Sequence, residues 1–284
     1  MLLRLKNYHF DLSQRCLVMG IMNRTQDSFF DHGAYFEMDS FLRRADQLVR
    51  EKADILDIGG VKAGPGPEVS ESEELDRVVP AIVKLRERFD IALSVDTWNT
   101  RVIDESMKAG AVLANDISGF GSAGYLEAVA RHGGAVVATH IRLVPRLADS
   151  NPVYQDLKAE VFQFLKIRTE MALSSGIGRE SILVDAGFDL GKTTVQSMEL
   201  LHSTSELTQL SFPVLISASN KGFIGEVLSR DINSRRNGSL SAAAIGAVQG
   251  AKVFRVHDVA GTRQVLDVIS AIGQGEAPAW LKGI

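Results

Sequence analysis

Residues 91–116 read IALSVDTWNTRVIDESMKAGAVLAND, an aliphatic run that ends at Asp96 and a second that ends at Asn115 and Asp116. Residues 100–109 lie between the two runs, have helical spacing, and are followed by Gly110, as is typical of a helix end. Continuous apolar runs, without alternation, indicate strands that are covered on both faces. The stretch therefore predicts a strand–helix–strand unit whose two strands both end in polar side chains.

The same unit repeats along the chain of 284 residues. We expect strands at residues 16–22, 54–58, 91–96, 111–116, 135–140, 181–185, 213–217 and 252–256. Helical patterns follow them at residues 39–51, 72–88, 100–109, 125–131, 157–174, 194–208, 240–249 and 259–272. Eight strands, each followed by a helix, predict an α/β fold, the (β/α)8 TIM barrel. An open, doubly wound sheet is the alternative, although residues 20–25 (GIMNRT) lack the glycine fingerprint that such sheets usually carry after the first strand.

The composition is that of an ordinary globular protein, with 45% hydrophobic and 23% charged residues. Because no Gly/Ser-rich or charged run is long enough to act as a linker, we expect residues 1–284 to form a single domain. Residues 2–12, with the turn-like Lys6 and Asn7, are expected to form a short hairpin across the barrel floor.

Several functions are disfavoured by the sequence. The net charge of −4 is spread along the chain, which argues against a nucleic-acid partner. Neither a signal-peptide core nor an apolar run of membrane-spanning length is visible, so we expect a cytoplasmic protein without a membrane partner. Cys16 is the only cysteine and is expected to be a packed, reduced thiol. Residues 187–194 (GFDLGKTT) resemble a phosphate loop but have three residues, not four, between the two glycines.

Polar side chains end nearly every predicted strand, and barrel enzymes carry their chemistry at these ends. The series comprises Asn23, Asp57, Asp96, Asn115, Asp116, Thr139, His140, Asp185, residues 217–221, Arg255 and His257. A single member such as Asp57 could simply close a turn, but the whole set would be costly to gather at one rim without a ligand. The carboxylates and amides suit a flat heterocycle with guanidine-like donors, whereas Arg255, His257 and Asn23 suit an anion, such as a phosphate with a metal. The sequence therefore predicts a site for a heterocycle that carries a diphosphate.

Six blocks of sequence resemble dihydropteroate synthases. They are MGIMNRTQDSFFD (residues 19–31), SVDTWN (94–99), NDISGF (115–120), DAGFDLGKT (185–193), SNKGFIGEVL (219–228) and FRVHDV (254–259). The resemblance implies a (β/α)8 transferase of folate biosynthesis that is usually a homodimer. It also implies a reaction in which 4-aminobenzoate condenses with a dihydropterin diphosphate and diphosphate is released.

The resemblance also implies roles for individual residues. By the family pattern, the pterin-binding residues are Asp96, Asn115, Asp185 and Lys221, and the diphosphate-binding residues are Asn23, Arg255 and His257. Asn23 matches the ligand of a magnesium ion, which makes Mg²⁺ the implied cofactor. The implied catalytic set is Lys221, Arg255 and His257.

The departures from the family pattern gather on the acceptor side of this predicted site. Where the family reads GGESTRPG, this chain reads GGVKAGPG, so residues 61–64 are Val61, Lys62, Ala63 and Gly64. Asn220 stands where the family has arginine. Lys62 either restores a charge to this loop or is a solvated lysine, and an ammonium does not replace the bidentate fork of arginine.

This pattern resembles the divergent second copy of the synthase found in some actinobacteria. Three hypotheses follow from it: an active synthase, a pterin-binding paralogue that is inactive or uses another acceptor, and a partner that regulates an authentic synthase.

Overall fold

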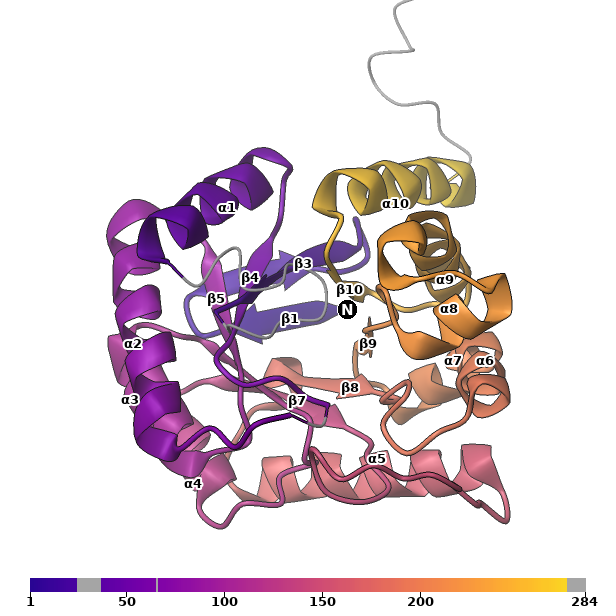
Figure 1. Ribbon diagram of the computed structural model, residues 1–284, viewed down its shortest axis with the longest axis horizontal. Helices are drawn as coiled ribbons and strands as arrows, with labels where there is room; N and C mark the ends of the chain where they lie inside the picture. The colour runs from indigo at the N-terminus through magenta and orange to yellow at the C-terminus, as the bar shows by residue number, and fades with distance from the viewer. Residues whose placement is uncertain (25–36, 65, 275–284) are drawn as a thin grey trace, which may run out of the picture.

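The computed structural model describes residues 1–24, 37–64 and 66–274, and in it eight parallel strands close into a barrel (Figure 1). The strands run in the order β10-β3-β4-β5-β6-β7-β8-β9 around the barrel. They are β3 (Leu17–Asn23), β4 (Ile55–Gly59), β5 (Ala92–Asp96), β6 (Leu113–Asp116), β7 (Ala135–Thr139), β8 (Ile182–Asp185), β9 (Val214–Ile216) and β10 (Val253–Val256). The predicted barrel is confirmed, and its closure excludes the open sheet.

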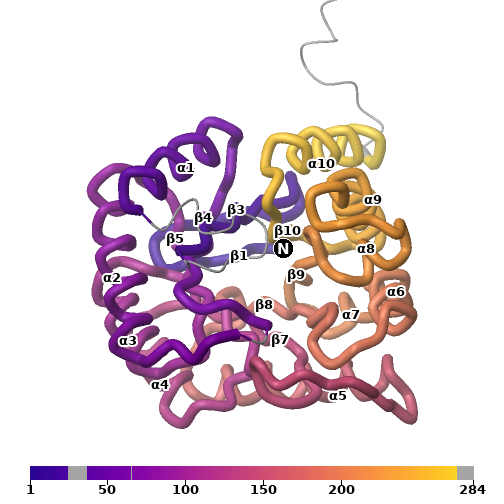
Figure 2. The backbone as a smooth tube through the Cα atoms, viewed as in Figure 1, coloured from indigo at the N-terminus to yellow at the C-terminus, as the bar shows by residue number. Residues whose placement is uncertain are grey.

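Helices form a ring outside the strands, as the tube in Figure 2 shows. They are α1 (Met38–Arg50), α2 (Glu71–Arg88), α3 (Thr100–Ala109), α4 (Tyr125–Arg131), α5 (Leu157–Ser174), α6 (Thr194–His202), α7 (Thr204–Leu207), α8 (Gly222–Leu228), α9 (Arg236–Val248) and α10 (Val259–Gln274). The bounds of α3, α4 and α5 are those expected from the sequence. None of the described helices has the length and apolar character needed to cross a membrane.

Three helical predictions differ from the structure. The single helix expected over residues 194–208 is broken at Ser203, which ends α6 and precedes α7. The short α8 was not predicted, because Gly222 and Gly225 lower its helix propensity. Helix α9 begins four residues before the expected residue 240, and Gly238 in its first turn hid that start.

A hairpin closes the floor of the barrel, as predicted. Strands β1 (Leu2–Leu5) and β2 (Tyr8–Asp11) pair antiparallel, and Lys6 takes a left-handed conformation in the turn between them. Leu3, Leu5 and Leu12 are fully buried against inward side chains from the lower ends of the barrel strands. This hairpin makes the lower half of the barrel interior an apolar core.

The period of two along each strand separates the interior into an apolar floor and a polar mouth. On β5, for example, Ala92 at the start of the strand belongs to the floor cluster. Asp96, four residues later, lies on the same face at the other end of the strand. Parallel register then places Asp96 level with Asn115 on β6, and Thr139 level with Asp185 on β8. The polar strand ends predicted from the sequence thus meet at one end of the barrel.

Candidate functional site

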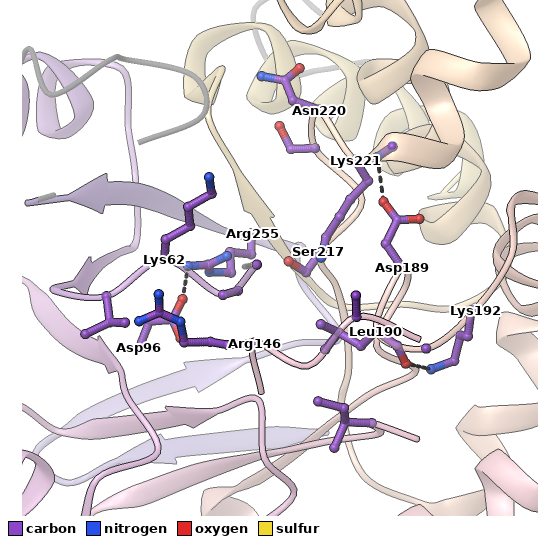
Figure 3. A pocket seen from close by; sticks show the side chains of 18 of the residues that line it. Lys62, Asp96, Arg146, Asp189, Leu190, Lys192, Ser217, Asn220, Lys221 and Arg255 are labelled. Carbon is purple, nitrogen blue, oxygen red and sulfur yellow. Dashed lines mark hydrogen bonds and ion pairs between the residues drawn. The ribbon is translucent and has the colours of Figure 1, made fainter. Parts of the chain in front are cut away.

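Two cavities lie at this mouth, and together they are lined by every residue to which the family resemblance assigns a role, whereas the strand-end residues Asp57, Asp116 and His140 line neither of them. The larger, of about 480 Å³, is lined by Asn23, Lys62, Ala63, Gly64, Asp96, Asn220, Lys221, Arg255 and His257 among others (Figure 3). The smaller, of about 30 Å³, is lined by Asn115 and Asp185 among others. The two share Ala63, Asp96, Leu190, Ser217, Lys221 and Arg255. Carboxylates of β5 and β8 therefore face one shared space, as the predicted heterocycle site requires.

Arg255 lies at the centre of this mouth and binds two carboxylates. Its Nε donates to Asp57 Oδ2 and its Nη2 to Asp96 Oδ2, both at 2.6 Å. The side chain of Asn115 donates to the same Asp57 oxygen at 3.2 Å. The residue types alone place Arg255 with the anion-binding residues and apart from the carboxylates. The structure brings the two groups together, because β10 is one strand away from β4 and its inward arginine reaches into the barrel interior.

Burial and this ion pair set the charge of the group. Burial raises the pKa of Asp96 to about 6, although the neighbouring Arg255 lowers it in part. Burial alone would lower the pKa of Arg255, but Asp57 and Asp96 outweigh that effect and raise it above its ordinary value. Arg255 is therefore a permanent cation, and Asp96 is a carboxylate that readily takes up a proton.

Asp185 is held at the mouth by the turn that follows β8. The backbone N–H of Gly187 donates to Asp185 Oδ1 at 2.7 Å, and burial raises the pKa of Asp185. Gly187 has a φ of 67°, and a Cβ added there would lie 1.9 Å from the carbonyl oxygen of His140. Only glycine fits this turn, so the orientation of Asp185 depends on it.

Lys192 lines the larger cavity, although it belongs to the segment of residues 187–194 whose glycine spacing does not match a phosphate loop. Its Nζ lies 2.8 Å from His140 Nδ1 and donates to the carbonyl oxygens of Gly187 at 2.9 Å and Leu190 at 3.2 Å. Burial lowers the pKa of Lys192 to about 7 and that of His140 to about 2. The amine thus fastens the loop after β8 to the end of β7, and Figure 3 shows it bonded to Leu190.

His257 follows β10 and is bound through Ser219, which follows β9. Ser219 Oγ accepts the backbone N–H of His257 at 3.2 Å and lies 3.0 Å from its Nδ1. Burial lowers the pKa of His257 to about 3, with Arg255 adding to the effect. The imidazole is therefore neutral at pH 7 and offers a ligand a hydrogen bond but no full charge.

Asn220 has a local structural role. It adopts a left-handed backbone, with φ of 58°, which asparagine tolerates better than most residues. Ser239 Oγ accepts its N–H at 3.0 Å and donates to its Oδ1 at 3.2 Å. Arg235 donates to the carbonyl oxygens of Asn220 at 3.1 Å and Lys221 at 3.2 Å. No motif pointed to Arg235, which holds this loop by its backbone.

A model of the family described as pterin binding enzyme matches residues 19–257. The chain belongs to this pterin-binding enzyme family. A dihydropteroate synthase of Haemophilus influenzae is 40% identical to it over 255 residues, which cover 89% of this chain and 93% of the relative. The inactive dihydropteroate synthase 2 of Mycobacterium leprae is 39% identical over 272 residues, which cover 94% of this chain and 93% of the relative. The crystal structure of the Yersinia pestis dihydropteroate synthase with a sulfonamide drug complex has a TM-score of 0.93 and 39% identity, and the match covers 97% of this chain and 100% of that one.

The predicted resemblance is therefore confirmed, including the similarity to a second, inactive copy. Identity alone does not place the chain among the active or the inactive members of the pterin-binding enzyme family, since the two relatives are 40% and 39% identical to it. The distinction has to come from the residues that line the cavities.

Proposed function

We propose that this chain binds a dihydropterin diphosphate at the barrel mouth and transfers the pterin-methyl group to the amine of 4-aminobenzoate, with release of diphosphate. The observation that carries the proposal is that Asp96, Asn115, Asp185 and Lys221 line the smaller cavity, which shares Asp96 and Lys221 with the larger cavity. Membership of the pterin-binding enzyme family and the likeness to dihydropteroate synthases support it.

The pterin ring is assigned to the buried carboxylates. A buried carboxylate is costly unless it accepts hydrogen bonds, and the amino and ring N–H groups of a pterin supply adjacent donors for Asp185. Lys221 faces the same space and, among the described residues, its amine makes no hydrogen bond or ion pair. Because about 30 Å³ is too small for a bicyclic ring, the ring extends into the larger cavity that shares these walls.

The diphosphate is assigned to the side of Asn23, Arg255 and His257. Cations and N–H donors fixed beside a leaving group stabilise the negative charge that develops on it, which is the catalytic role proposed for Arg255, His257 and Lys221. The neutral imidazole of His257 contributes a hydrogen bond, whereas the two cations contribute charge.

Magnesium is the proposed cofactor, and the residues in place fit it. No group of three or more His, Cys, Asp or Glu side chains that could hold a metal occurs within the described parts of the chain. Mg²⁺ prefers oxygen ligands and is often bound through one protein side chain together with substrate phosphates. Asn23 offers an amide oxygen at the cavity wall, opposite Gly59. When bound there, magnesium would neutralise part of the charge of the diphosphate.

A second candidate function is a pterin-binding paralogue that is inactive, uses another amine or regulates an authentic synthase. The observation that favours it is the lining of the larger cavity by Ala63 and Gly64, which bring no hydroxyl or guanidinium to the site. The likeness to a relative named inactive also supports it.

A homodimer is proposed from the apolar side chains exposed on neighbouring helices. Val195 and Met198 on α6 are 72% and 45% exposed, and Ile245 and Val248 on α9 are 47% and 74% exposed. Exposed apolar side chains that gather on one face are typical of an interaction surface. Light scattering tests this, with twice 30.9 kDa as the expected mass. A cytoplasmic location stays a prediction.

One assay separates the candidate functions. The purified protein is incubated with dihydropterin diphosphate, magnesium and 4-aminobenzoate, and both diphosphate and dihydropteroate are followed. Formation of both products supports the synthase, and diphosphate alone supports a different acceptor. If no product forms but calorimetry detects pterin binding, the inactive paralogue is supported. Absence of pterin binding overturns the synthase, the use of a different acceptor and the inactive paralogue alike.

A further inference from the structure

The connection between β7 and α5 brings an unpredicted arginine into the larger cavity. Arg146 lines this cavity, and its Nη2 donates to the carbonyl oxygen of Pro67, just beyond the loop of residues 61–64. Figure 3 shows its guanidinium on the side of the cavity where Lys62 and Asp96 lie. The guanidinium thus stands beside the loop in which Gly64 contributes no side chain.

The other arginines and the buried lysine of this cavity are already used by the protein. Arg255 binds Asp57 and Asp96. Arg235 donates to three backbone carbonyl oxygens of residues 220, 221 and 230, and Lys192 donates to two carbonyl oxygens. By contrast, the bond to Pro67 is the only hydrogen bond of the Arg146 side chain to a described residue, and no described carboxylate forms an ion pair with it. Most of its five N–H donors therefore remain for a ligand.

The backbone at Arg146 is held in an unfavourable conformation. Its φ of 68° lies in the left-handed region, which residues with a Cβ rarely adopt. Such conformations persist where the surrounding structure imposes them, and they cluster at ligand-binding positions. Here the bond to Pro67 holds the side chain at the cavity wall.

Apolar side chains from the same connection line this cavity together with Arg146. Leu143, Val144 and Leu147 belong to the same connection, line the same cavity, and are 39%, 61% and 59% exposed. Leu190 lines the cavity as well. An apolar wall beside a guanidinium with unused donors fits a ligand that has an apolar body and one carboxylate, because guanidinium and carboxylate form paired, charge-assisted hydrogen bonds.

We propose that Arg146 binds the carboxylate of the second substrate and so determines which amines this site accepts. This assignment rests on the proposed function, since the second substrate is the amine that meets the bound pterin. It defines the acceptor class as amines with a flat apolar body and a carboxylate, of which 4-aminobenzoate is one.

The test compares 4-aminobenzoate with 4-aminobenzamide, which has the same shape but no charge. Wild-type protein, Arg146→Met, Arg146→Lys and the control Arg101→Met are each loaded with dihydropterin diphosphate and magnesium. Arg101 is paired with Glu71, is 67% exposed in its side chain and does not line the larger cavity. The readouts are KM and kcat for each amine, or dissociation constants from calorimetry where no product forms.

We expect wild type and Arg101→Met to prefer the carboxylate about 10- to 100-fold over the amide, the range of one charge-assisted contact. Arg146→Met should lose that preference because its KM or Kd for 4-aminobenzoate rises while that for 4-aminobenzamide stays the same. Arg146→Lys should keep part of the preference. A preference that is unchanged in Arg146→Met, or absent from wild type, while pterin still binds, overturns the role of Arg146 and leaves the proposed function standing. Absence of pterin binding to wild type overturns the proposed function and this assignment with it.

Discussion

Arg255 Nε lies 2.6 Å from the carboxylate of Asp57, whose side chain is completely buried. The second carboxylate oxygen of Asp57 is buried without a hydrogen-bond partner among the described residues. This ion pair, together with the hydrogen bond from Asn115, therefore compensates a charge placed inside the barrel. It also fixes the arginine that we assign to the diphosphate.

Removal of Arg255 should destabilise the fold as well as the site. We expect Arg255→Met to lower the free energy of unfolding by about 3–5 kcal/mol, because it leaves buried carboxylates without their counter-charge. Urea denaturation at pH 7.5 measures this. Arg101→Met removes an exposed ion pair, and its loss should stay below about 1 kcal/mol. Similar losses in the two variants would contradict the structural importance of the Arg255 ion pair.

Asp185 and Lys62 should differ sharply in their effect on pterin binding. Asp185→Ala removes the buried carboxylate assigned to the ring, so we expect the pterin affinity to fall about 100-fold or more. Lys62 lines only the larger cavity, and Lys62→Ala should change that affinity by less than about threefold. Calorimetry with a pterin ligand gives both values, and equal losses would count against the assignment of the ring to the smaller cavity.

Asn23 should affect the metal and not the ring. We expect Asn23→Ala to raise the magnesium concentration needed for half-maximal binding of dihydropterin diphosphate, because the variant lacks the proposed protein ligand. Binding of a pterin without diphosphate should stay the same in wild type and variant. An unchanged magnesium dependence would remove Asn23 from the metal site.

Glu74 should make stability depend on pH. Burial raises the pKa of Glu74 to about 7, although Thr97 donates to it at 2.6 Å. Between pH 4.5 and 7 the folded state therefore binds more protons than the unfolded state. The contribution of Glu74 to stability is fully present below pH 4.5 and is lost as the pH rises through 7.

Glu74→Gln has no charge to bury and should therefore gain stability relative to wild type as the pH rises. We expect the difference in unfolding free energy between the two proteins to shift in favour of the variant by on the order of 2–3 kcal/mol from pH 4.5 to pH 8. Glu87→Gln on the same helix, which is exposed, serves as the control. Parallel pH profiles for wild type and Glu74→Gln would show that the buried carboxyl does not control this slope.

The floor hairpin should contribute to stability through one face only. Leu5→Ala removes a fully buried side chain, and we expect a cost of about 2–5 kcal/mol. Leu2 is 39% exposed on the other face of β1, and Leu2→Ala should change stability by about 0.5 kcal/mol or less. Chemical denaturation of the two variants compares them. A small cost at Leu5 would mean that the barrel closes its core without the hairpin.

The fold was predictable because its strands are continuous apolar runs and several helices carry clear end signals. Asn99 caps the N-terminus of α3, and Gly110 ends the helix in a left-handed conformation. Helix α8 was not predictable, because Gly222 and Gly225 contradict its local propensity and packing decides its formation.

The strand ends of the site were also predictable, since alternation along a strand fixes which side chains face the interior. Asp96, Asn115 and Asp185 lie where that rule places them. Arg146, Arg235 and Lys192 were not predicted, because they depend on loop conformations that have no periodic signal. The pairing of Arg255 with Asp57 depends on closure of the barrel, which brings together residues 198 positions apart.

That separation has a consequence for the order in which the protein is made. The two carboxylates leave the ribosome 198 and 159 residues before the arginine that neutralises them. A nascent chain that ends before β10 carries both acids without this partner, so burying them inside the barrel would be costly. The last strand therefore supplies the charge that both buried acids need in the closed barrel.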